Sequence, residues 1–364
     1  MDTNAGLEGV VAADTMLSEV DGERGRLTVR GYGLAELVGR RTFEEMTELL
    51  LAGFFPELAA PPLRAALGAA REEVFASLPQ PDERLLALTP AETLRALLAR
   101  LADGEDFATA LRLIAAPGVF VGTIGRWRAG LQAIPPDRAA GHAADVLRML
   151  RGVPVAEPDA HALDQYLVTV AEHGLNASTF AARIVASTRA GLASACIAAL
   201  CALKGPLHGG APGPVLDMLD AIGTADRAPE WLEQSLRRGE RLMGFGHRIY
   251  RVRDPRADAL RACLQRLGAA RAIPSARLEL ADAVEAAALS LLRREKPERA
   301  LETNVEFYTA LLLEALAVPR GLFTCFFSVG RIAGWIAHAR EQVLNGRLIR
   351  PSSRYIGPAP SQAA

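Results

Sequence analysis

The stretch from Ser178 to Leu203 constrains the fold most, because it is apolar on nearly every side and rich in small residues. A helix of this kind has no polar face to turn toward water, so other elements have to bury it. Small side chains also let neighbouring backbones pack closely. We therefore expect one helix, or two helices joined by a break, either in the core or as half of a subunit interface.

Helical signals follow one another along most of the remaining chain. Thr42 with Glu45, and Thr89 with Glu92, form capping-box patterns ahead of runs with helical apolar spacing. The start of the chain differs, since strand-like pieces between residues 10 and 30 indicate a small β-hairpin. These patterns predict an all-α fold with a minor N-terminal β region.

Composition excludes several classes of protein. The 364 residues carry a net charge of −1 and are 50% hydrophobic, which argues against a nucleic-acid-binding surface. The longest uncharged apolar run, Ala190–Leu203, is too short to span a bilayer. The four cysteines form no paired motif, and no targeting segment begins the chain. We expect free thiols and a cytoplasmic protein that binds neither nucleic acid nor membrane.

Three segments carry residues suited to acid–base chemistry. His208 precedes two glycines, His247 follows a Gly-Phe-Gly segment, and Glu306 lies in Asn-Val-Glu-Phe-Tyr. Glycines let a backbone approach a ligand closely and leave N–H groups free to face it. Two imidazoles and a carboxylate can supply a hydrogen-bond donor, a general acid and a general base without a metal.

These segments, in this order, resemble the citrate synthase family, which includes the citrate and 2-methylcitrate synthases. The similarity runs from Gly9 to the C-terminus. It implies a large helical domain of residues 1–211 and 319–364, which would carry the dimer contact and the oxaloacetate site. A small helical domain of residues 212–318 would carry the coenzyme A side and the catalytic carboxylate. The helices become more charged and amphipathic in that segment, which fits a smaller, better-solvated unit.

The resemblance also assigns catalytic roles. His208 matches the histidine that hydrogen-bonds the acetyl thioester oxygen as the enol forms. His247 matches the histidine that binds and protonates the keto oxygen of oxaloacetate. Glu306 matches the base that takes a proton from the acetyl methyl group, where most of the family has aspartate. Glu302 could share a helical face with Glu306, but the surrounding motif favours Glu306.

A second set of residues would bind oxaloacetate. His173 and Asn176 fit the family's His-x-x-Asn-x-Ser segment, although Asn176 could equally cap the next helix. Arg256 and Arg331 match carboxylate-binding arginines, and Arg350 matches one that reaches into the partner subunit's site. Arg331 stands out on physical grounds, because an arginine on so apolar a helix must find an anion, a structural salt bridge or water.

The remaining implications concern coenzyme A and oligomeric state. No tightly bound cofactor and no metal are expected, with a coenzyme A thioester as co-substrate. The protein would be a homodimer whose small-molecule substrates are oxaloacetate and an acyl-CoA. Residues predicted to line the coenzyme A side are Lys204, Gly209, Gly210, Arg248 and Arg251.

Glu306 is the departure from the family pattern. Its extra methylene moves the carboxylate by about 1 Å, and a misplacement of this size can cost ~10²-fold in rate. The leading hypothesis is still condensation of acetyl-CoA with oxaloacetate to give citrate and CoA. The alternatives are 2-methylcitrate synthesis from propionyl-CoA, cleavage of citryl-CoA, and a non-catalytic CoA- or citrate-binding protein. His142, His161 and His338 fit no constellation.

Overall fold

Helices dominate the described residues of this computed structural model, which are 6–7, 9–59, 62–208, 212–271 and 276–357. The α-helices before residue 155 are α1 (Leu34–Leu37), α2 (Phe43–Leu51), α3 (Leu63–Ala76), α4 (Glu83–Ala87), α5 (Pro90–Leu98), α6 (Phe107–Arg128) and α7 (His142–Arg151). Those after it are α8 (Glu157–Val170), α9 (Ala177–Ala186), α10 (Leu192–Leu203), α11 (Pro212–Ile222), α12 (Ala228–Arg237), α13 (Pro255–Arg271), α14 (Ala276–Glu295), α15 (Val305–Ala315) and α16 (Phe323–Asn345). Short 3₁₀ turns lie at Pro56–Ala59, Ala225–Arg227 and Arg320–Leu322. The predicted all-α class is confirmed.

Local sequence signals determine where helices begin. Thr42 and Thr89 each accept a hydrogen bond from the backbone N–H three residues later, and the glutamate at that position bonds back to the threonine N–H. Two otherwise unpaired donors are satisfied at each helix start. Both predicted capping boxes are therefore confirmed.

The N-terminal region forms a small antiparallel sheet of β1 (Ser18–Asp21), β2 (Arg26–Val29) and β3 (Tyr32–Gly33), in that order. The pairing of β1 with β2 confirms the predicted hairpin. The strand-like piece near Val11 forms no strand, and Val11 is 84% exposed.

The apolar stretch that begins at Ser178 is a broken pair of helices. α9 ends at Ala186, and α10 begins after Gly191. Gly191 has a φ of +96°, a backbone conformation that glycine adopts without strain. The carboxylate of Asp103 accepts from Ala193 N at 2.7 Å and so caps α10 from another part of the chain. The pair packs against α16, but its outer face, including Ile184, is partly exposed in the single chain.

Two helices, α6 and α16, are long and apolar enough to cross a membrane by length and composition, yet most of each is buried by other helices. α16 also lies very close to the end of α8. A Cβ on Gly334 would sit 2.3 Å from the carbonyl oxygen of Ala171, so only glycine fits. This close approach brings Arg331, on the same helix, to the end of α8.

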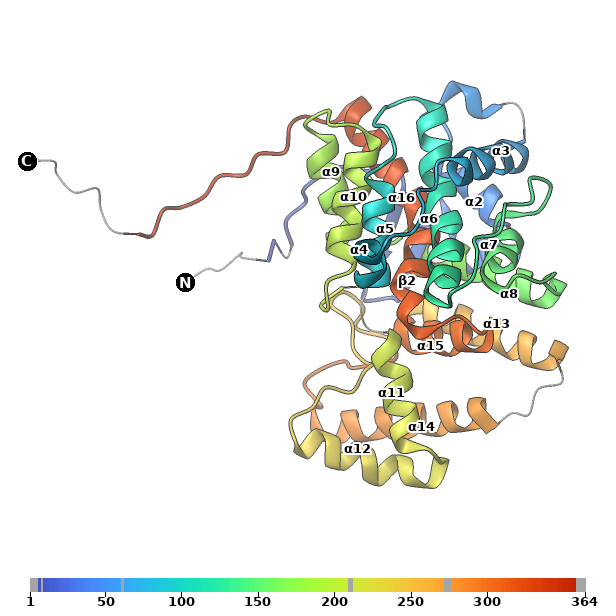
Figure 1. The fold of residues 1–364 in the computed structure, drawn as a ribbon. Coiled ribbons are helices and arrows are strands. Elements are labelled where there is room, and N and C mark those ends of the chain that lie inside the picture. Colours follow the sequence, from blue (N-terminus) through green and yellow to red (C-terminus); the bar gives the residue numbers. More distant parts are fainter. Residues whose placement is uncertain (1–5, 8, 60–61, 209–211, 272–275, 358–364) are drawn as a thin grey trace, which may run out of the picture.

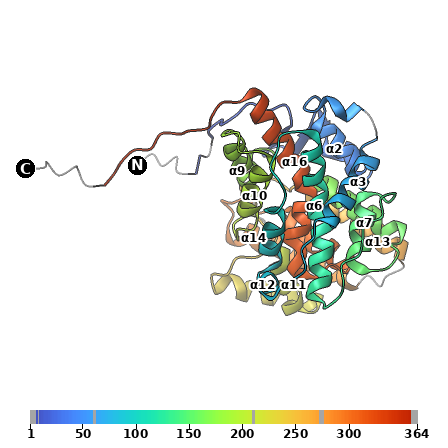
Figure 2. The same ribbon diagram turned by 45° about the horizontal axis from the view of Figure 1, so that its top comes forward.

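The helices divide into an upper and a lower group in Figure 1. α11, α12 and α14 gather at the lower end, and α13 and α15 lie between them and the rest. α13 packs against both α8 and α15, which joins the two groups. After α16 the chain runs as an extended segment away from the body in both views (Figures 1 and 2).

Candidate active site

The connection between α8 and α9 carries two predicted site residues. Asn176 is the N-cap of α9, and its Oδ1 accepts from the backbone N–H groups of Ser178 and Thr179 at 3.1 Å each. The capping role is therefore confirmed. His173 is buried, and its Nε2 lies 3.1 Å from the hydroxyl of Tyr250. Asn176 thus places a helix N-terminus, which favours negative charge, beside His173.

His208 lies just after α10, in a turn closed by hydrogen bonds. The backbone N–H of Ser178 points at its Nε2 at 3.3 Å, and the Ser178 hydroxyl lies 2.9 Å away. Because a backbone N–H can only donate, Nε2 accepts and Nδ1 carries the proton. The Trp335 indole N–H holds the Ser178 hydroxyl at 3.1 Å. Gly209 and Gly210 lie outside the described residues.

His247 is oriented by its own loop. Gly244 and Gly246 have φ values of +86° and +82°, which glycine adopts without strain. The Nδ1 of His247 then accepts from the backbone N–H groups of Ile249 and Tyr250, both at 3.1 Å. Nε2 therefore carries the proton and is the ring's donor. The ring lies edge-on to His173, with centroids 5.5 Å apart.

The three histidines are neutral at neutral pH. Burial, followed by the charges of Arg331 and Arg256, lowers the pKa of His208 to about 4. Burial and then Arg256 lower the pKa of His247 to about 4. Burial and the same two arginines hold the pKa of His173 well below its usual value. Each ring is therefore a neutral hydrogen-bonding group rather than a cation.

Arg256 is held by Asp254, the residue that precedes α13. Asp254 Oδ2 accepts from Arg256 Nη2 at 2.8 Å, and Oδ1 accepts from Arg256 Nε at 3.1 Å. Oδ1 also accepts from the Arg256 backbone N–H at 3.0 Å and so caps the start of α13. Both side chains are buried. The contact between Arg256 Nη2 and His247 Nε2 is long, at 3.4 Å, because both atoms carry hydrogen.

Arg331 is almost fully buried and forms no ion pair among the described residues. Its Nε donates to the carbonyl of Val170, and its guanidinium lies over the Phe327 ring at 4.9 Å. Its Nη2 has no hydrogen-bond partner in the described part of the chain. Burial lowers its pKa to about 10, although nearby Glu172 acts in the opposite direction. A buried cation without a counter-ion is suited to binding an anionic ligand.

Glu306 lies in the first turn of α15. Asn304 caps this helix and accepts from the Glu306 N–H at 3.0 Å. The Oε2 of Glu306 is buried and has no hydrogen-bond partner within the described ranges. Burial raises the pKa of Glu306 to about 7, with Arg256 and Arg331 lowering it and Asp254 raising it further. A carboxyl group with a pKa near neutrality is matched to general base catalysis.

Glu302 and Lys204 both have ionic partners. The Glu302 carboxylate pairs with Arg293 at 2.9 Å, whereas Glu306 lies among the site arginines, so the geometry favours Glu306 as the base.

The ammonium group of Lys204 lies 3.7 Å from a carboxylate oxygen of Glu92 on α5. Its predicted role toward coenzyme A stays a prediction.

The other predicted basic residues are at the surface. Arg248 and Arg251 are exposed on the loop that carries His247. Arg350 is exposed on the segment after α16, and among the described residues it has no hydrogen bond or ion pair with another predicted site residue. The structure thus brings His173, His208, His247, Arg256, Glu306 and Arg331 together, and leaves Arg350 outside that cluster.

The β1–β2 turn supports the His247 loop from one side. The carbonyl of Gly22 accepts from Arg251 N at 2.9 Å, and a Cβ on Gly22 would lie 2.3 Å from the carbonyl oxygen of Ile249. Gly25 approaches Val252 in the same way, with 2.7 Å between its would-be Cβ and a side-chain carbon. The backbones of two segments that lie more than 200 positions apart in the sequence are therefore in direct contact.

The same loop is anchored from the other side by Arg253. Its Nη1 donates to Glu285 at 2.6 Å, and the second oxygen of Glu285 accepts from the Tyr308 hydroxyl at 2.6 Å. The Arg253 side chain therefore binds to α14 and, through Glu285, to α15, and does not serve a ligand.

Sequence reasoning missed a buried network behind His173. His338 Nδ1 lies 3.0 Å from a guanidinium nitrogen of Arg183, which can only donate, so Nε2 carries the proton and donates to Glu172 at 3.0 Å. Glu172 also accepts from Ser18 at 2.8 Å. His338 makes no contact that suggests catalysis, yet it steadies the residue next to His173. The sequence signal that could have indicated this network is Glu172, an acidic residue at the end of an apolar run.

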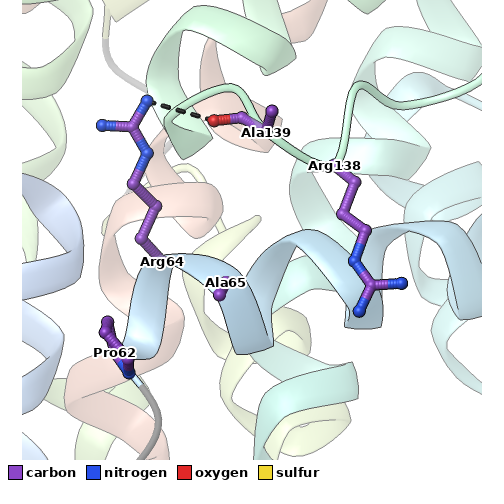
Figure 3. Close-up of a pocket in the computed structure, with 5 residues that line it drawn as sticks. All are labelled: Pro62, Arg64, Ala65, Arg138 and Ala139. Atoms are coloured by element: carbon purple, nitrogen blue, oxygen red, sulfur yellow. Dashed lines mark hydrogen bonds between the residues drawn. The ribbon is translucent and has the colours of Figure 1, made fainter.

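A separate surface pocket of about 460 Å³ lies at the start of α3. Figure 3 shows that the two arginines lining it point in different directions, Arg64 toward the carbonyl of Ala139 and Arg138 away from it. They do not converge on one ligand, and none of the site residues lines this pocket.

Among the described residues, no group of three or more His, Cys, Asp or Glu side chains is arranged to hold a metal ion.

Comparison with known proteins agrees with this geometry. The sequence model of the family "Citrate synthase, C-terminal domain" matches residues 6–352. The chain is 42% identical to putative citrate synthase 2 of Mycobacterium tuberculosis, over 98% of this chain and 93% of that protein. It is 35% identical to a 2-methylcitrate synthase of the same species, over 98% and 91%. A citrate synthase of Thermoplasma acidophilum, solved with carboxymethyl coenzyme A and oxaloacetate, superimposes with a TM-score of 0.85 at 25% identity, over 99% and 98%.

The fold and the cluster of histidines, arginines and a carboxylate define an acyltransferase of the condensing type. The chain belongs to the citrate synthase family. Members of this family are enzymes that condense a coenzyme A thioester with oxaloacetate, and this chain is an enzyme of that class.

Proposed function

We propose that the enzyme condenses acetyl-CoA with oxaloacetate and hydrolyses the product thioester to citrate and CoA. One juxtaposition carries the proposal: the buried Glu306 carboxyl lies within electrostatic reach of the buried arginines Arg256 and Arg331. A base with a pKa near 7 is thereby placed beside two cations suited to a dicarboxylate.

In the first step, Glu306 removes a proton from the α-carbon of the acyl group. Negative charge develops on the thioester oxygen as the enol forms. His208 presents Nδ1–H as a donor because its Nε2 accepts from Ser178. A fixed neutral donor stabilises this charge without reorganising, which is the basis of oxyanion stabilisation.

In the second step, the enol carbon attacks the keto carbon of oxaloacetate. His247, whose Nε2 carries the proton, donates it to the alkoxide that forms on the keto oxygen. Arg256 and Arg331 bind the substrate carboxylates, and His173 completes the pocket. Water then cleaves the citryl-CoA thioester, so the products are citrate and free CoA.

A homodimer is part of the proposal. Arg350 lies on an extended exposed segment, from which it would complete the site of a second copy. The partly exposed apolar faces of α9 and α10 supply a contact surface, with Ile184 38% exposed. In the single chain these helices are not buried on every side, which favours the subunit-interface interpretation of this stretch.

The segment 212–318 is proposed to be a small domain that closes over the large one. α11, α12 and α14 gather at the lower end of the molecule (Figure 1). Closure would exclude water from the enol and bring in coenzyme A. We assign contacts with coenzyme A to Lys204, Gly209, Gly210, Arg248 and Arg251. A cytoplasmic location fits the four cysteines, which are free thiols.

Use of propionyl-CoA to form 2-methylcitrate is the second candidate, favoured by the similarity to the mycobacterial 2-methylcitrate synthase. The two acyl groups differ by one methylene, worth about 1–3 kcal/mol in a pocket. Release of free CoA thiol from each thioester in the presence of oxaloacetate tests both. A higher kcat/KM for acetyl-CoA supports citrate synthesis, and a higher value for propionyl-CoA supports the alternative.

Absence of CoA release with either thioester, from folded protein that still binds oxaloacetate, would reject the condensation. It would leave a binding role, or cleavage of citryl-CoA to acetyl-CoA and oxaloacetate, which frees no thiol and is detected as oxaloacetate formed when citryl-CoA is supplied. The Glu306→Gln variant serves as the blank, because it retains the shape of the side chain and removes the base.

A further inference from the structure

Tyr166, on α8, has a polar group that the fold does not use. The side chain is fully buried, and its hydroxyl has no hydrogen-bond partner among the described residues. Buried tyrosine hydroxyls usually find a partner, and an unsatisfied one destabilises the fold. An unsatisfied hydroxyl that phenylalanine could replace without a change of shape suggests a ligand or a partner formed during the reaction.

The place of Tyr166 on α8 connects it to the active site. Tyr166 lies one helical turn before Val170, the residue whose carbonyl accepts from the Nε of Arg331. The same helix leads directly into the segment of His173. Arg331 is therefore bound to the helix face that Tyr166 shares, next to the substrate-binding cluster.

The charges around Tyr166 identify its neighbour. Burial raises the pKa of its phenol well above the usual value, the negative charge of Glu306 raises it further, and Arg331 acts in the opposite direction. Glu172, whose Oε2 also has no partner among the described residues, is bound to Ser18 and His338 through its other oxygen. Glu306 is the carboxylate whose charge acts on Tyr166, and α15, which carries Glu306, packs against α8, which carries Tyr166.

Unpartnered atoms remain on both groups. The Oε2 of Glu306 is a buried acceptor, and the Tyr166 hydroxyl is a buried donor. Arg331 Nη2 is a further unpartnered donor, but it is the group suited to a substrate carboxylate. No hydrogen bond joins Tyr166 to Glu306 in this structure. Such contacts are often long in the absence of substrate and shorten in the substrate complex.

We propose that Tyr166 is a positioning residue for the base, and that its hydroxyl donates to Glu306 Oε2 in the substrate complex. The other oxygen of Glu306 is then directed at the acyl group. The extra methylene of glutamate, compared with aspartate, supplies the reach toward α8. This inference rests on the proposed function, in which Glu306 removes the α-proton.

A double-mutant cycle tests the inference, using the full-length protein, acetyl-CoA and oxaloacetate. Tyr166→Phe is expected to lower kcat by about 10- to 100-fold, the loss typical of a hydrogen bond to a charged group. It also moves the acid limb of the kcat profile to higher pH, because the lost bond favoured the ionised carboxyl. In a Glu306→Asp background the shorter side chain cannot reach the Tyr166 hydroxyl, so adding Tyr166→Phe does not lower kcat further.

Thermal stability separates this role from a structural one. Tyr166→Phe removes an unsatisfied hydroxyl, so its Tm is unchanged or higher. The control is Tyr308→Phe, which removes a hydroxyl bonded to Glu285 at 2.6 Å. That variant has a lower Tm, and the midpoint of its acid limb is unchanged.

A readout without turnover keeps the inference separate from the proposed function. Infrared difference spectra of wild type against Glu306→Gln report the titration of Glu306 directly with oxaloacetate bound. The midpoint is expected to rise in Tyr166→Phe. Independent, additive effects of the two substitutions on kcat, or an unchanged Glu306 midpoint in Tyr166→Phe, would overturn the inference. Wild-type protein that releases no CoA but shows the midpoint shift would contradict only the proposed function.

Discussion

Asp254 and Arg256 form a buried pair in which the carboxylate contacts the guanidinium through both oxygens, at 2.8 and 3.1 Å. The same carboxylate accepts from the backbone N–H of Val305 at 3.2 Å, at the start of the helix that carries Glu306. One side chain therefore joins the arginine proposed to bind oxaloacetate to the helix that carries the proposed base.

Replacing Asp254 with Asn is expected to lower both stability and the pKa of Glu306. Leaving a buried arginine without its counter-ion typically costs about 3–5 kcal/mol of folding free energy. The negative charge of Asp254 raises the pKa of Glu306, so the acid limb of the kcat profile moves to lower pH when it is removed. Asp258→Asn is the matched control, because its side chain is 60% exposed and pairs with Arg253. A profile unchanged in Asp254→Asn would contradict the coupling.

The activity of the wild-type enzyme should fall as pH decreases through about 7. Glu306 acts as a base only when ionised, and burial raises its pKa to about 7. Bound oxaloacetate neutralises Arg256 and Arg331, whose charges lower this pKa. The midpoint at saturating oxaloacetate therefore lies above 7, and a pH profile of kcat measures it. A midpoint near the usual glutamate value would show that Glu306 is not the base.

Glu306→Gln should stabilise the fold at alkaline pH. The folded pKa of about 7 exceeds the value of 4.5 for an unperturbed carboxyl, so the folded state is disfavoured progressively as pH rises from 4.5 to 7. The full effect is on the order of 3 kcal/mol above pH 7. The Tm difference between variant and wild type is therefore expected to be larger at pH 8 than at pH 5. Equal differences at both pH values would contradict the raised pKa.

Arg331→Leu should weaken oxaloacetate binding without loss of stability. The substitution removes a buried cation that lacks an ion pair among the described residues, so Tm is unchanged or higher. KM for oxaloacetate rises by ~30-fold or more, corresponding to a loss of about 2 kcal/mol or more. In the control Arg183→Leu, the arginine is equally buried but pairs with Glu341 at 2.6 Å, so Tm falls. A lower Tm in Arg331→Leu would indicate a structural role instead.

The sequence predicted those features that depend on neighbouring residues. The capping residues Thr42 and Thr89 act within one turn of the chain. Arg331 was also recognisable, because a charge on an apolar helix is conspicuous at any position.

The features that the sequence did not predict depend on distant parts of the chain. The protonation of His208 is determined by Ser178, 30 residues away, and His338 meets Glu172 across 166 residues. Tyr166 resembles any core aromatic residue until the fold shows that its hydroxyl has no partner among the residues that the structure describes. Tertiary contacts of this kind leave no periodic or spacing signal.

The β1–β2 turn provides the last prediction, because it connects the N-terminal sheet to catalysis. Gly22 allows its backbone to meet the His247 loop, where a Cβ would lie 2.3 Å from the Ile249 carbonyl oxygen. That carbonyl is only two residues from His247, whose orientation depends on the N–H groups of Ile249 and Tyr250. Gly22→Ala is therefore expected to displace the loop and lower kcat by about 10²-fold, the loss associated with a misplacement of about 1 Å.

Gly31→Ala is the matched control in the neighbouring turn of the same sheet. Gly31 has a φ of +87° but no heavy atom within 4 Å of its would-be Cβ. Its substitution strains the backbone by about 1 kcal/mol or more and lowers Tm, without displacing the catalytic loop. Measurements of kcat and Tm on both variants separate loss of stability from displacement of the loop. If the sheet contributes only to stability, both variants have a lower Tm and an unchanged kcat. Reduced kcat in Gly22→Ala alone shows that the turn orients His247 through its contact with the loop.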